Sequence, residues 1–573
     1  MEAAIDLSPP PRAFVPSGLL VERWGPFEAL YERLAEARPE SPDALLRWLH
    51  RWSELKSVIA EEGTRRMVAT SLDTADEAAS SAYLEFIRVF APKVSEWDNR
   101  LERAYCESPH RAALRARGLE QLDRILSINV ELFDERNIPL QVQASELVHA
   151  YDEITGGWIV RFEGREHTIQ EMAKYLQDAD RARRARAFEA TARVRLADRD
   201  RLDDRYDALL GVRGAIAENL GLPDYRAYSF REMLREYTPE DCETFHAAIE
   251  RAAVPLLAEL YESRRRRLGV DRLEPWDLQV DPEGRAPLRP FEAVPELLDR
   301  VAGLFTSLDA RLGRRFEAIR PYMDLESRKG KAPGGFQATF QEQRRPFIFA
   351  NLVGVHDDIS TLVHESGHAF HCVEGRSQDL VWLTEPAMEF CEVSSMSQEL
   401  LILGRLDAFY SDPDARRRAA VSQWESAVQI FCWVGVIDAF QHWIYTNPGH
   451  GREERRAKFT ELYRRFIPVI DWSGAPGGTL ENYWQRQLHL YHVPFYYIEY
   501  AIAELGALQV YRNFRRDPAE AVTKLLEAQR LGGRLGAPGL FEAAGIRFDL
   551  GPDLLSDLMA MAREELRELG EVQ

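Results

Sequence analysis

The order of apolar and polar residues along this 573-residue chain predicts a fold built mostly of α-helices. Apolar residues recur at the three- and four-residue spacing of a helical face through most of the chain. The stretches with this periodicity are 27–136, 170–221, 239–268, 291–325 and 423–445. Prolines break the first stretch into shorter helices, and Thr238 is the expected cap of a helix that starts at Pro239.

Alternating apolar and polar residues predict β-structure in two places. The first is a small hairpin that turns at Glu163 and Gly164, a pair suited to a tight turn. The second is a pair of short strands over 334–340 and 346–352, directly ahead of a further helix. The fold class is therefore expected to be mostly α, with a small sheet beside that helix.

The second pair of strands offers a way to bind a substrate. An exposed edge could accept an extended peptide as an added strand, which holds its backbone without reading its side chains. Gly335, Phe336 and Ala350 are the substrate contacts expected on these strands. The same pattern also fits a hairpin that is buried in the core, and both interpretations stay open at this point.

The length of the chain predicts more than one lobe. A chain of 573 residues exceeds what one hydrophobic core usually supports, so at least two packed lobes are expected. Prolines near the start, among them Pro9 and Pro16, predict that residues 1–24 form an extended leader. We expect an N-terminal helical lobe with the small hairpin over 25–200. A second domain, which holds the candidate catalytic residues, is expected over 201–573.

The composition narrows the class of partner. A formal charge of −20 argues against binding to nucleic acids or anionic membranes. The five cysteines are scattered, which suits a reducing compartment, and we interpret Cys372 and Cys391 as small core residues. The start of the sequence lacks the pattern of a signal peptide, and its apolar runs are too short to span a membrane. A cytoplasmic protein without a nucleic-acid or membrane partner is expected.

The strongest chemical signal is the string His-Glu-Ser-Gly-His at 364–368. Residues four apart project from one face of a helix, so His364 and His368 can bind one metal ion. Two imidazoles suit Zn²⁺, which takes three protein ligands in catalytic sites and leaves one position for water. Glu365 would then lie beside that water.

The flanking residues predict where this helix begins and ends. Asp357 or Asp358 is the expected N-cap, because a carboxylate can accept hydrogen bonds from the first free N–H groups. Gly375 can adopt a left-handed backbone conformation and is expected to end the helix.

A third ligand decides whether the string is a metal site or a chance match. Glu374 is the nearer candidate, but the extended metzincin pattern needs a Gly and then a His around it, and the chain has neither. The farther candidates lie on a second helix that Pro386 can begin, and they are Glu385, Glu389, Glu392 and Glu399. Glu392 lies at the centre of this acidic stripe and would complete a two-His, one-Glu set. A solvated acidic face is the alternative interpretation.

These residues resemble a known family. The string at 364–368, followed by Phe-Cys-Glu-Val-Ser-Ser-Met at 390–396, resembles the oligoendopeptidase F and thimet oligopeptidase family of zinc metallopeptidases. The segment 329–336 is similar to that family's stretch before its substrate-binding strand. The segment 489–501 is similar to its His/Tyr-rich active-site stretch. The resemblance runs from about Arg181 to the C-terminus and is looser before that point.

The resemblance implies a metal site, a base and a molecular shape. It implies one Zn²⁺ bound by His364, His368 and Glu392, with Glu365 as the general base. It also implies two helical lobes around a deep substrate channel. Such a channel would admit short unstructured peptides and would exclude folded proteins by their size.

The His/Tyr-rich segment carries the other candidate catalytic groups. If the segment is helical, Tyr496 and Tyr500 share one face and Tyr497 lies nearly on it. By the resemblance, Tyr497 and Tyr500 match the family's two active-site tyrosines, and His489 matches its substrate-binding histidine. Tyr496 and His492 are expected at the substrate. Tyr500 is the first choice for the donor that stabilises the oxyanion.

The leading hypothesis is a zinc-dependent endopeptidase of short peptides in which Glu365 activates water. The alternatives are a helical binding protein that keeps the fold without catalysis, and a zinc exopeptidase. Glu389 and Glu399 are both candidates to orient the zinc histidines. The cleavage preference and the oligomeric state stay open.

Overall fold

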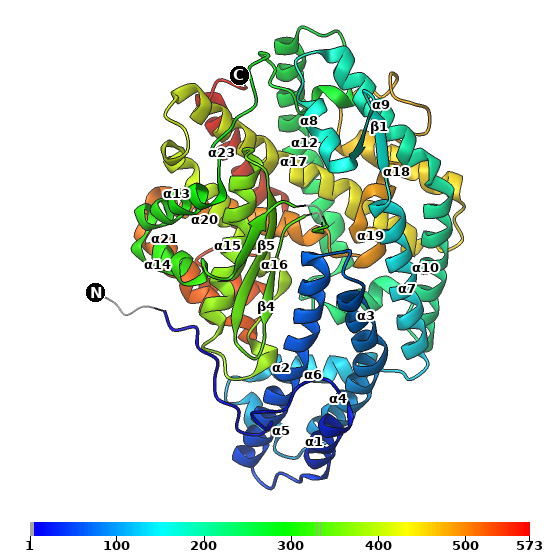
Figure 1. Cartoon of the computed structure of the whole chain (residues 1–573), viewed down its shortest axis with the longest axis vertical. Coiled ribbons are helices and arrows are strands. Elements are labelled where there is room, and N and C mark those ends of the chain that lie inside the picture. Colours follow the sequence, from blue (N-terminus) through cyan, green and yellow to red (C-terminus); the bar gives the residue numbers. More distant parts are fainter. Residues whose placement is uncertain (1–4, 329, 333, 573) are drawn as a thin grey trace.

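The computed structural model describes residues 5–328, 330–332 and 334–572, which fold largely into helices (Figure 1). The mostly α fold expected from the sequence is confirmed. The helix α12 (Pro239–Leu268) begins as expected, because the Thr238 hydroxyl accepts from the N–H of Asp241 at 3.2 Å. Longest of the helices is α17 (Pro413–Thr446), which Asp412 caps in the same way.

The N-terminal lobe packs around its own hydrophobic core, at the lower end of Figure 1. Trp52 is fully buried there, and its indole N–H donates to the carboxylate of Asp98, 2.9 Å away. Lys56 forms an ion pair with the same carboxylate, which balances the buried charge. The lobe's elements are α1 (Gly25–Glu36), α2 (Pro42–Leu72), α3 (Glu77–Glu85), η1 (Phe86–Phe90), α4 (Ala91–Cys106), α5 (Arg111–Arg115) and α6 (Glu120–Leu132).

A second group of helices shares the largest core, in which α12 and α17 lie side by side (Figure 1). Its other helices are α7 (Asn137–Gly156), α10 (Arg199–Asn219), α11 (Tyr225–Glu232), α16 (Met388–Leu401), α18 (Arg452–Phe466), α20 (Ile498–Arg516), α22 (Ala537–Ala543) and α23 (Pro552–Glu568). Shorter elements complete this part of the chain: η2 (Pro275–Asp277), η5 (Tyr483–Arg486), α19 (Leu488–His492) and η6 (Gly532–Arg534).

The predicted small hairpin is confirmed. Strands β1 (Ile159–Phe162) and β2 (Arg165–Thr168) pair in antiparallel fashion. Glu163 and Gly164 turn the chain with φ of 49° and 77°, the left-handed values that a tight hairpin turn requires. The hairpin packs on α8 (Ile169–Leu176) and α9 (Arg181–Ala197).

A three-stranded sheet lies beside α15 (Asp357–Gly375), as expected. Its strand order is β3 (Met323–Glu326), β5 (Arg345–Leu352) and β4 (Phe336–Phe340), with β4 antiparallel and β3 parallel to β5. Strand β3 was not predicted from the sequence. The helical pattern expected over 291–325 ends at Ile319, in α13 (Val294–Leu308) and α14 (Ala310–Ile319). The core around this sheet also contains α21 (Pro518–Arg530), and η3 (Val381–Leu383) and η4 (Ile402–Ala408) flank α16.

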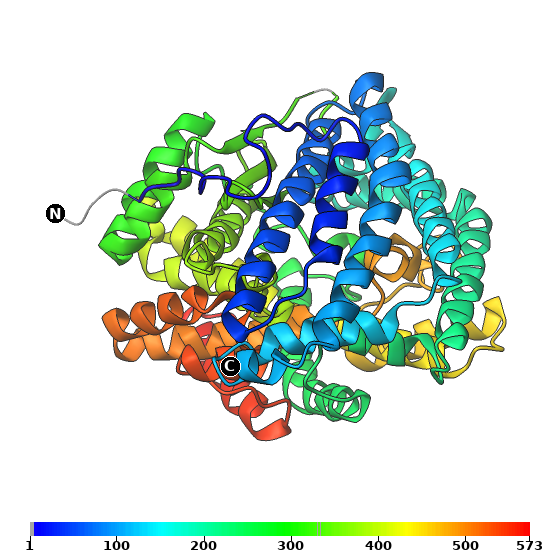
Figure 2. The same cartoon turned by 90° about the horizontal axis from the view of Figure 1, so that it is seen from below.

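Residues 5–24 run without helix or strand along the outside of the molecule, from the sheet to the N-terminal lobe (Figure 2). The carboxylate of Glu54 accepts from the backbone N–H groups of residues 13–15, and Arg12 pairs with Glu342. The expected domain boundary at residue 200 falls in the first turn of α10. The division into 25–200 and 201–573 therefore stays a prediction.

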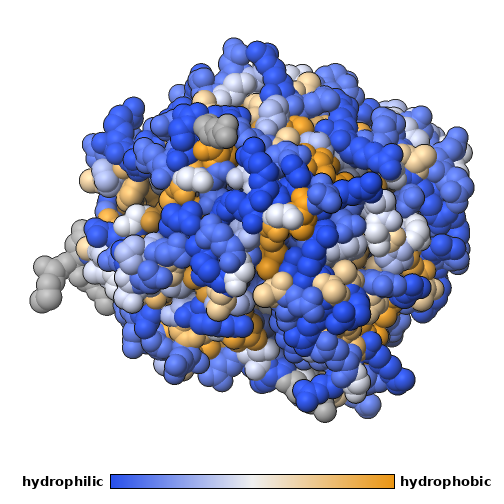
Figure 3. All heavy atoms as spheres, turned by 90° about the horizontal axis from the view of Figure 1, so that it is seen from above, coloured by the Kyte–Doolittle hydropathy of each residue, from blue (hydrophilic) through white to orange (hydrophobic). Residues whose placement is uncertain are grey.

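Polar and charged residues cover most of the face drawn in Figure 3, and apolar residues appear there as separate strips. Among the described residues, α17 is long and apolar enough to cross a membrane by those two criteria alone. Its most apolar window is 72% buried inside the protein, as in a helix of a folded core.

Candidate active site

The site is built where α15 and α16 pack against each other. Gly367 makes this contact close, because a Cβ on it would lie 2.4 Å from the Cα of Ser395. Gly375 serves a similar purpose, since its Cβ would lie 2.4 Å from the Thr384 carbonyl oxygen. The helix ends at Gly375 as expected, but the expected left-handed conformation is wrong, because the φ of Gly375 is not positive. The expected N-cap is also wrong, because the Asp358 carboxylate accepts from the turn over 353–355.

The two histidines of the motif and Glu392 meet at one point. His364 Nε2 and His368 Nε2 lie 3.2 Å apart, and they lie 3.4 and 3.5 Å from Glu392 Oε2. Ligand atoms about 2.0–2.1 Å from a tetrahedral zinc ion lie about 3.3–3.4 Å from each other. The three atoms therefore have the spacing that a zinc ion requires, and the residues fit the metal.

The charges at this point favour a cation. Burial acts to lower the pKa of His364, but the hydrogen bonds and charges of Glu392 and Glu399 outweigh it and raise that pKa to about 10. Burial acts in the same direction on His368, and Cys391 and Glu392 raise its pKa well above the usual value. The carboxylates thus stabilise positive charge between the imidazoles, which is the charge that a metal dication brings.

Each motif histidine has a partner on its second nitrogen. Glu399 Oε1 lies 2.7 Å from His364 Nδ1, and Cys391 Sγ lies 3.4 Å from His368 Nδ1. Of the two carboxylates considered from the sequence, Glu399 contacts a motif histidine. Cys391 was not expected there, because its position fitted a small core residue. Such partners fix the orientation of a metal-binding imidazole.

Of the other acidic candidates, Glu385 lines the cleft and accepts from Gln341 at 2.6 Å, whereas Glu374 and Glu389 lie elsewhere. Glu374 forms ion pairs with Arg315 and Arg530, so its carboxylate is already neutralised away from the histidines. Burial raises the pKa of Glu389, the charge of Arg235 acts against this rise, and Glu389 does not line the cleft. Neither position supports a role as third ligand.

Glu365 faces the same cleft as the metal-ligand candidates. Its side chain is only 7% exposed, and among the described residues its Oε2 has no hydrogen-bond partner. Burial raises the pKa of this carboxyl, and the two neighbouring histidines act against the rise. A buried carboxylate with a free oxygen beside a metal site has the properties of a general base.

The His/Tyr-rich segment is not one helix. It consists of α19, a turn, and α20, and Phe495 in the turn has a left-handed φ of 69°. Two distant residues hold this strained turn: Arg235 donates to the Phe495 carbonyl, and Gln441 Oε1 accepts from the Phe495 N–H at 2.7 Å. The turn brings the tyrosines to the cleft by a route that helical spacing did not predict.

Tyr496 and Tyr500 line the cleft with the histidines and Glu392. The Tyr496 hydroxyl donates to Glu392 Oε1 at 2.9 Å, which leaves Oε2 facing the imidazoles. The Tyr500 hydroxyl lies 3.4 Å from His489 Nε2. Burial raises the pKa of Tyr500, so its hydroxyl keeps its proton at neutral pH.

A chain of hydrogen bonds sets the tautomer of His489. The Trp433 indole, which can only donate, bonds to Gln487 Oε1 at 3.0 Å and thereby turns the amide nitrogen toward His489. That nitrogen lies 2.7 Å from His489 Nδ1, which must accept. Burial lowers the pKa of His489 to about 4, so the ring is neutral and carries its hydrogen on Nε2. His489 therefore donates toward Tyr500.

Three expected site residues lie away from the cleft surface. Tyr497 packs behind His489 and Tyr500, with ring centroids 4.9 and 5.3 Å away, and does not line the cleft. His492 pairs with Asp152 on α7 at 2.8 Å. Ala350 is fully buried on the middle strand of the sheet, which has partners on both edges, so a direct substrate contact there is wrong.

Gly335 and Phe336, at the start of the edge strand β4, line the cleft as expected. Lys329 and Pro333, in the same resembling stretch, lie outside the described residues. Gly335, His364 and Glu365 also border a second hollow that extends to Gln177 and Ser422. The cleft therefore continues on both sides of the metal-ligand candidates.

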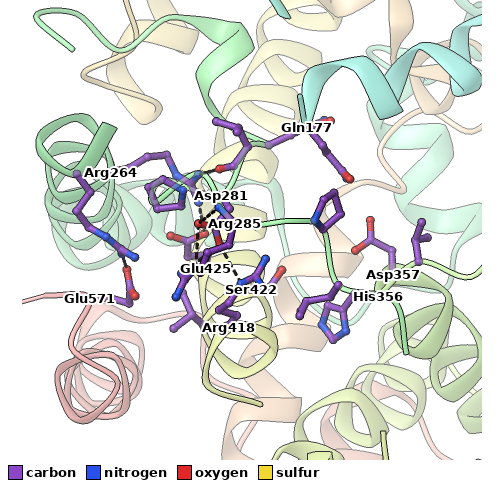
Figure 4. Close-up of a pocket in the computed structure, with 18 residues that line it drawn as sticks. Gln177, Arg264, Asp281, Arg285, His356, Asp357, Arg418, Ser422, Glu425 and Glu571 are labelled. Carbon is purple, nitrogen blue, oxygen red and sulfur yellow. Dashed lines mark hydrogen bonds and ion pairs between the residues drawn. The ribbon is translucent and has the colours of Figure 1, made fainter. Parts of the chain in front are cut away.

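A further pocket adjoins that second hollow and shares Arg264, His356 and Asp357 with it (Figure 4). Its arginines are matched by acids. Arg264 pairs with Glu425 at 2.8 Å, and Arg418 pairs with Asp281 at 2.8 Å. We interpret the ion pairs that line this pocket as structural: they hold α12, α17 and the loop near residue 281 together at the end of the cleft.

The model of peptidase family M3 matches residues 174–557. The chain belongs to peptidase family M3. The family's N-terminal domain also matches, over residues 25–133. Recognition of this family from the sequence is thereby confirmed.

Relatives and solved structures are similar to this chain over different shares of its length. Oligoendopeptidase F homologs of Borreliella burgdorferi and Lactococcus lactis are each 20% identical, over 49% and 55% of this chain. The match spans about half the length of these relatives, 48% and 52%. PZ peptidase A, solved with an inhibitor, is 25% identical with a TM-score of 0.91, over 98% of this chain and 100% of that one. Oligoendopeptidase-F from Enterococcus faecium shares the fold, with a TM-score of 0.65 at 15% identity over 95% of this chain and 96% of that one.

Proposed function

We propose that this member of family M3 is a cytoplasmic zinc-dependent endopeptidase that hydrolyses short, unstructured peptides. The observation that carries the proposal is the tetrahedral spacing of His364 Nε2, His368 Nε2 and Glu392 Oε2. The free oxygen of Glu365 borders the same cleft. A binding protein without catalysis has no need of a metal set and an unpartnered buried carboxylate together.

Each residue has a chemical role in this proposal. Zinc bound by the three ligands would supply a Lewis acid that lowers the pKa of a water molecule to about 7. Glu365 Oε2 takes the proton of the attacking water and later returns it to the leaving amine. Tyr500 donates its hydroxyl hydrogen to the carbonyl oxygen of the substrate as negative charge develops there.

His489 and Tyr497 support that hydrogen bond. His489 Nε2 donates to the Tyr500 oxygen, so the phenolic hydrogen is left free for the substrate. Tyr497 packs against both rings and keeps them in place. We propose His489 and Tyr497 as positioning residues that act through Tyr500, while Tyr500 itself acts at the substrate.

The substrate backbone is proposed to bind along β4. This strand pairs with β5 on one edge only, and its first residue Phe336 and the preceding Gly335 line the cleft. Phe336 is held in place by stacking on Phe349, with ring centroids 4.7 Å apart. Pairing of a peptide with the free edge would align its backbone over the metal ligands, whatever its side chains are.

An exopeptidase that recognises a free C-terminus is the second candidate. Arg344 and Arg376 border the cleft, and their guanidinium groups donate to backbone carbonyls instead of closing on carboxylates. Burial lowers the pKa of both side chains, but an arginine keeps its charge at neutral pH, so two cations border the cleft in a position to bind a peptide carboxylate. The continuation of the cleft beyond both sides of the ligands favours the endopeptidase.

Internally quenched peptides separate these candidates. The endopeptidase proposal expects equal cleavage of a peptide with a free C-terminus and of the same peptide with an amidated one. It also expects loss of activity after chelation and recovery with Zn²⁺ alone. Cleavage of the free form only would establish the exopeptidase, and absence of cleavage by zinc-loaded protein would support the binding protein.

A further inference from the structure

Two helices away from the cleft carry a second set of metal-binding side chains. Cys242 and His246 lie four residues apart on α12, and Asp438 and His442 lie four residues apart on α17. Residues at this spacing share one face of a helix, and the two faces meet inside the largest core. All four side chains are buried, with residue exposures between 0% and 5%.

The donor atoms of this set lie close together. One atom each from Cys242, Asp438 and His442 lies within 4.8 Å of the other two. His246 Nε2 lies 2.8 Å from Asp438 Oδ2, and His442 Nε2 lies 3.3 Å from the same oxygen. Ligand atoms of four-coordinate zinc lie about 3.3–3.6 Å apart. His442 Nε2 and Asp438 Oδ2 already have this spacing, whereas His246 Nε2 would move away from Asp438 Oδ2 and Cys242 would move inward to complete a tetrahedral site.

The protein atoms alone leave this set unsatisfied. Among the described residues, Asp438 Oδ1 and His442 Nε2 are buried without a hydrogen-bond partner of good geometry. Aromatic rings pack on the imidazole of His442: the ring centroids of Phe495 and Phe230 lie 5.3 and 6.1 Å from it. Desolvated polar atoms in such a shell are unfavourable unless something binds them.

The charges of the set suit a divalent ion. A thiolate from Cys242 and the carboxylate of Asp438 would together neutralise the charge of Zn²⁺. The two imidazoles would complete its four-coordinate shell. Arg226 Nη1 lies 3.3 Å from His442 Nδ1 and is the neighbouring cation. When His442 Nε2 binds the metal, His442 Nδ1 carries a hydrogen and no longer accepts from Arg226. The Arg226 guanidinium can then turn toward Asp224, whose carboxylate lies 3.7 Å from Arg226 Nε.

We propose that Cys242, His246, Asp438 and His442 bind one structural Zn²⁺ that joins α12 to α17. The site is separate from the catalytic ligands and closed by four protein donors, so it holds no position for water. It lies behind the turn that positions Tyr496 and Tyr500, because His442 packs on Phe495 and the neighbouring Gln441 accepts from the Phe495 N–H. The bound ion would stabilise the support of that turn.

Metal analysis of a variant without catalytic ligands tests this proposal. The double variant His364→Ala, His368→Ala removes the other metal site and leaves the buried set intact. After equilibration with Zn²⁺ and dialysis, we expect one zinc per chain in the double variant and two in the unmodified protein. A folded double variant that holds zinc only at the level of a buffer blank would overturn the proposal.

Cobalt provides a second readout that identifies the thiolate. The double variant loaded with Co²⁺ should show a thiolate-to-cobalt charge-transfer band, and adding Cys242→Ser should abolish it and lower the zinc content. A control, His167→Ala, removes a buried histidine of the β1–β2 hairpin and should change neither signal. Binding of cobalt without the thiolate band would contradict the ligand set, even if the serine variant fails to fold.

Discussion

Replacement of Tyr500 by Phe removes one hydroxyl from the cleft and leaves the packing of the ring intact. In the structure this hydroxyl lies 3.4 Å from His489 Nε2, which carries a hydrogen because Nδ1 accepts from Gln487. His489 is therefore the donor to Tyr500, and the phenolic hydrogen can point at a substrate oxygen. Burial keeps the pKa of Tyr500 above its usual value, so this hydrogen is present at neutral pH.

The size of the expected loss in kcat follows from the proposed role of Tyr500 as a donor to the oxyanion. One donor to a developing oxyanion contributes about 10²–10³ in kcat, or about 2.7–4 kcal/mol of transition-state stabilisation. The ground state loses only a long hydrogen bond, and a typical one contributes about 1 kcal/mol to stability. Tyr500→Phe should therefore lower kcat by two to three orders of magnitude. KM, zinc content and thermal stability should stay nearly the same.

Steady-state hydrolysis of an internally quenched peptide measures this effect. Tyr497→Phe is the matched control, because Tyr497 packs behind the cleft and should lose little activity. A rise in KM alone for Tyr500→Phe would make Tyr500 a substrate-binding residue. A loss of thermal stability without a change in kcat would reduce it to a packing residue, and both results would refute the reasoning.

Three further predictions concern the support of the site and the N-terminal lobe. Glu399→Ala should weaken zinc affinity about 10- to 100-fold in chelator competition, because His364 Nδ1 loses its acceptor; unchanged affinity would contradict this. Arg235→Ala should destabilise the protein by about 3–5 kcal/mol, since it leaves Glu499 and the Phe495 carbonyl without their buried donor. An unchanged thermal midpoint would argue against that anchor. Burial raises the pKa of Glu102 from 4.5 to about 7, so the folded state keeps a proton that the unfolded state loses as pH rises through this window. Stability should therefore fall by about 3 kcal/mol between pH 5 and 8, and Glu102→Gln should remove this part of the pH dependence of the thermal midpoint.

Most of the helical fold could be predicted from the sequence, because local signals decide it. Thr238 and Pro239 begin α12 where expected, and Glu163 and Gly164 turn the small hairpin. The strand β3 could not be predicted, since its four residues pair with β5 only through tertiary contact. That third strand also buries Ala350 in the middle of the sheet, away from a substrate.

The candidate site shows the same division between local and distant causes. The spacing of His364 and His368 is a local property of a helix, so their convergence could be predicted. The path from His489 to Tyr500 depends on a left-handed Phe495, which Arg235 and Gln441 hold from distant parts of the chain. The spacing of residues predicted one helix over this segment, because such local spacing carries no information about contacts with distant residues.

A contact with a distant residue also explains the position of His492, which was expected at the substrate. Its imidazole pairs with Asp152 of α7 and does not line the cleft, and the sequence around His492 carries no sign of that partner. Cys391 was overlooked because a small residue beside Glu392 fits a core position, and only the packing of α15 on α16 brings its sulfur to His368.

The most direct test of the central claim is the turnover of Glu365→Gln on a quenched peptide. Glutamine keeps the size of the side chain and cannot take the proton of the attacking water. We expect kcat to fall by about 10²–10⁴-fold. A variant that keeps more than about a tenth of the original kcat, a barrier change of only about 1.4 kcal/mol, would contradict the assignment of Glu365 as the general base.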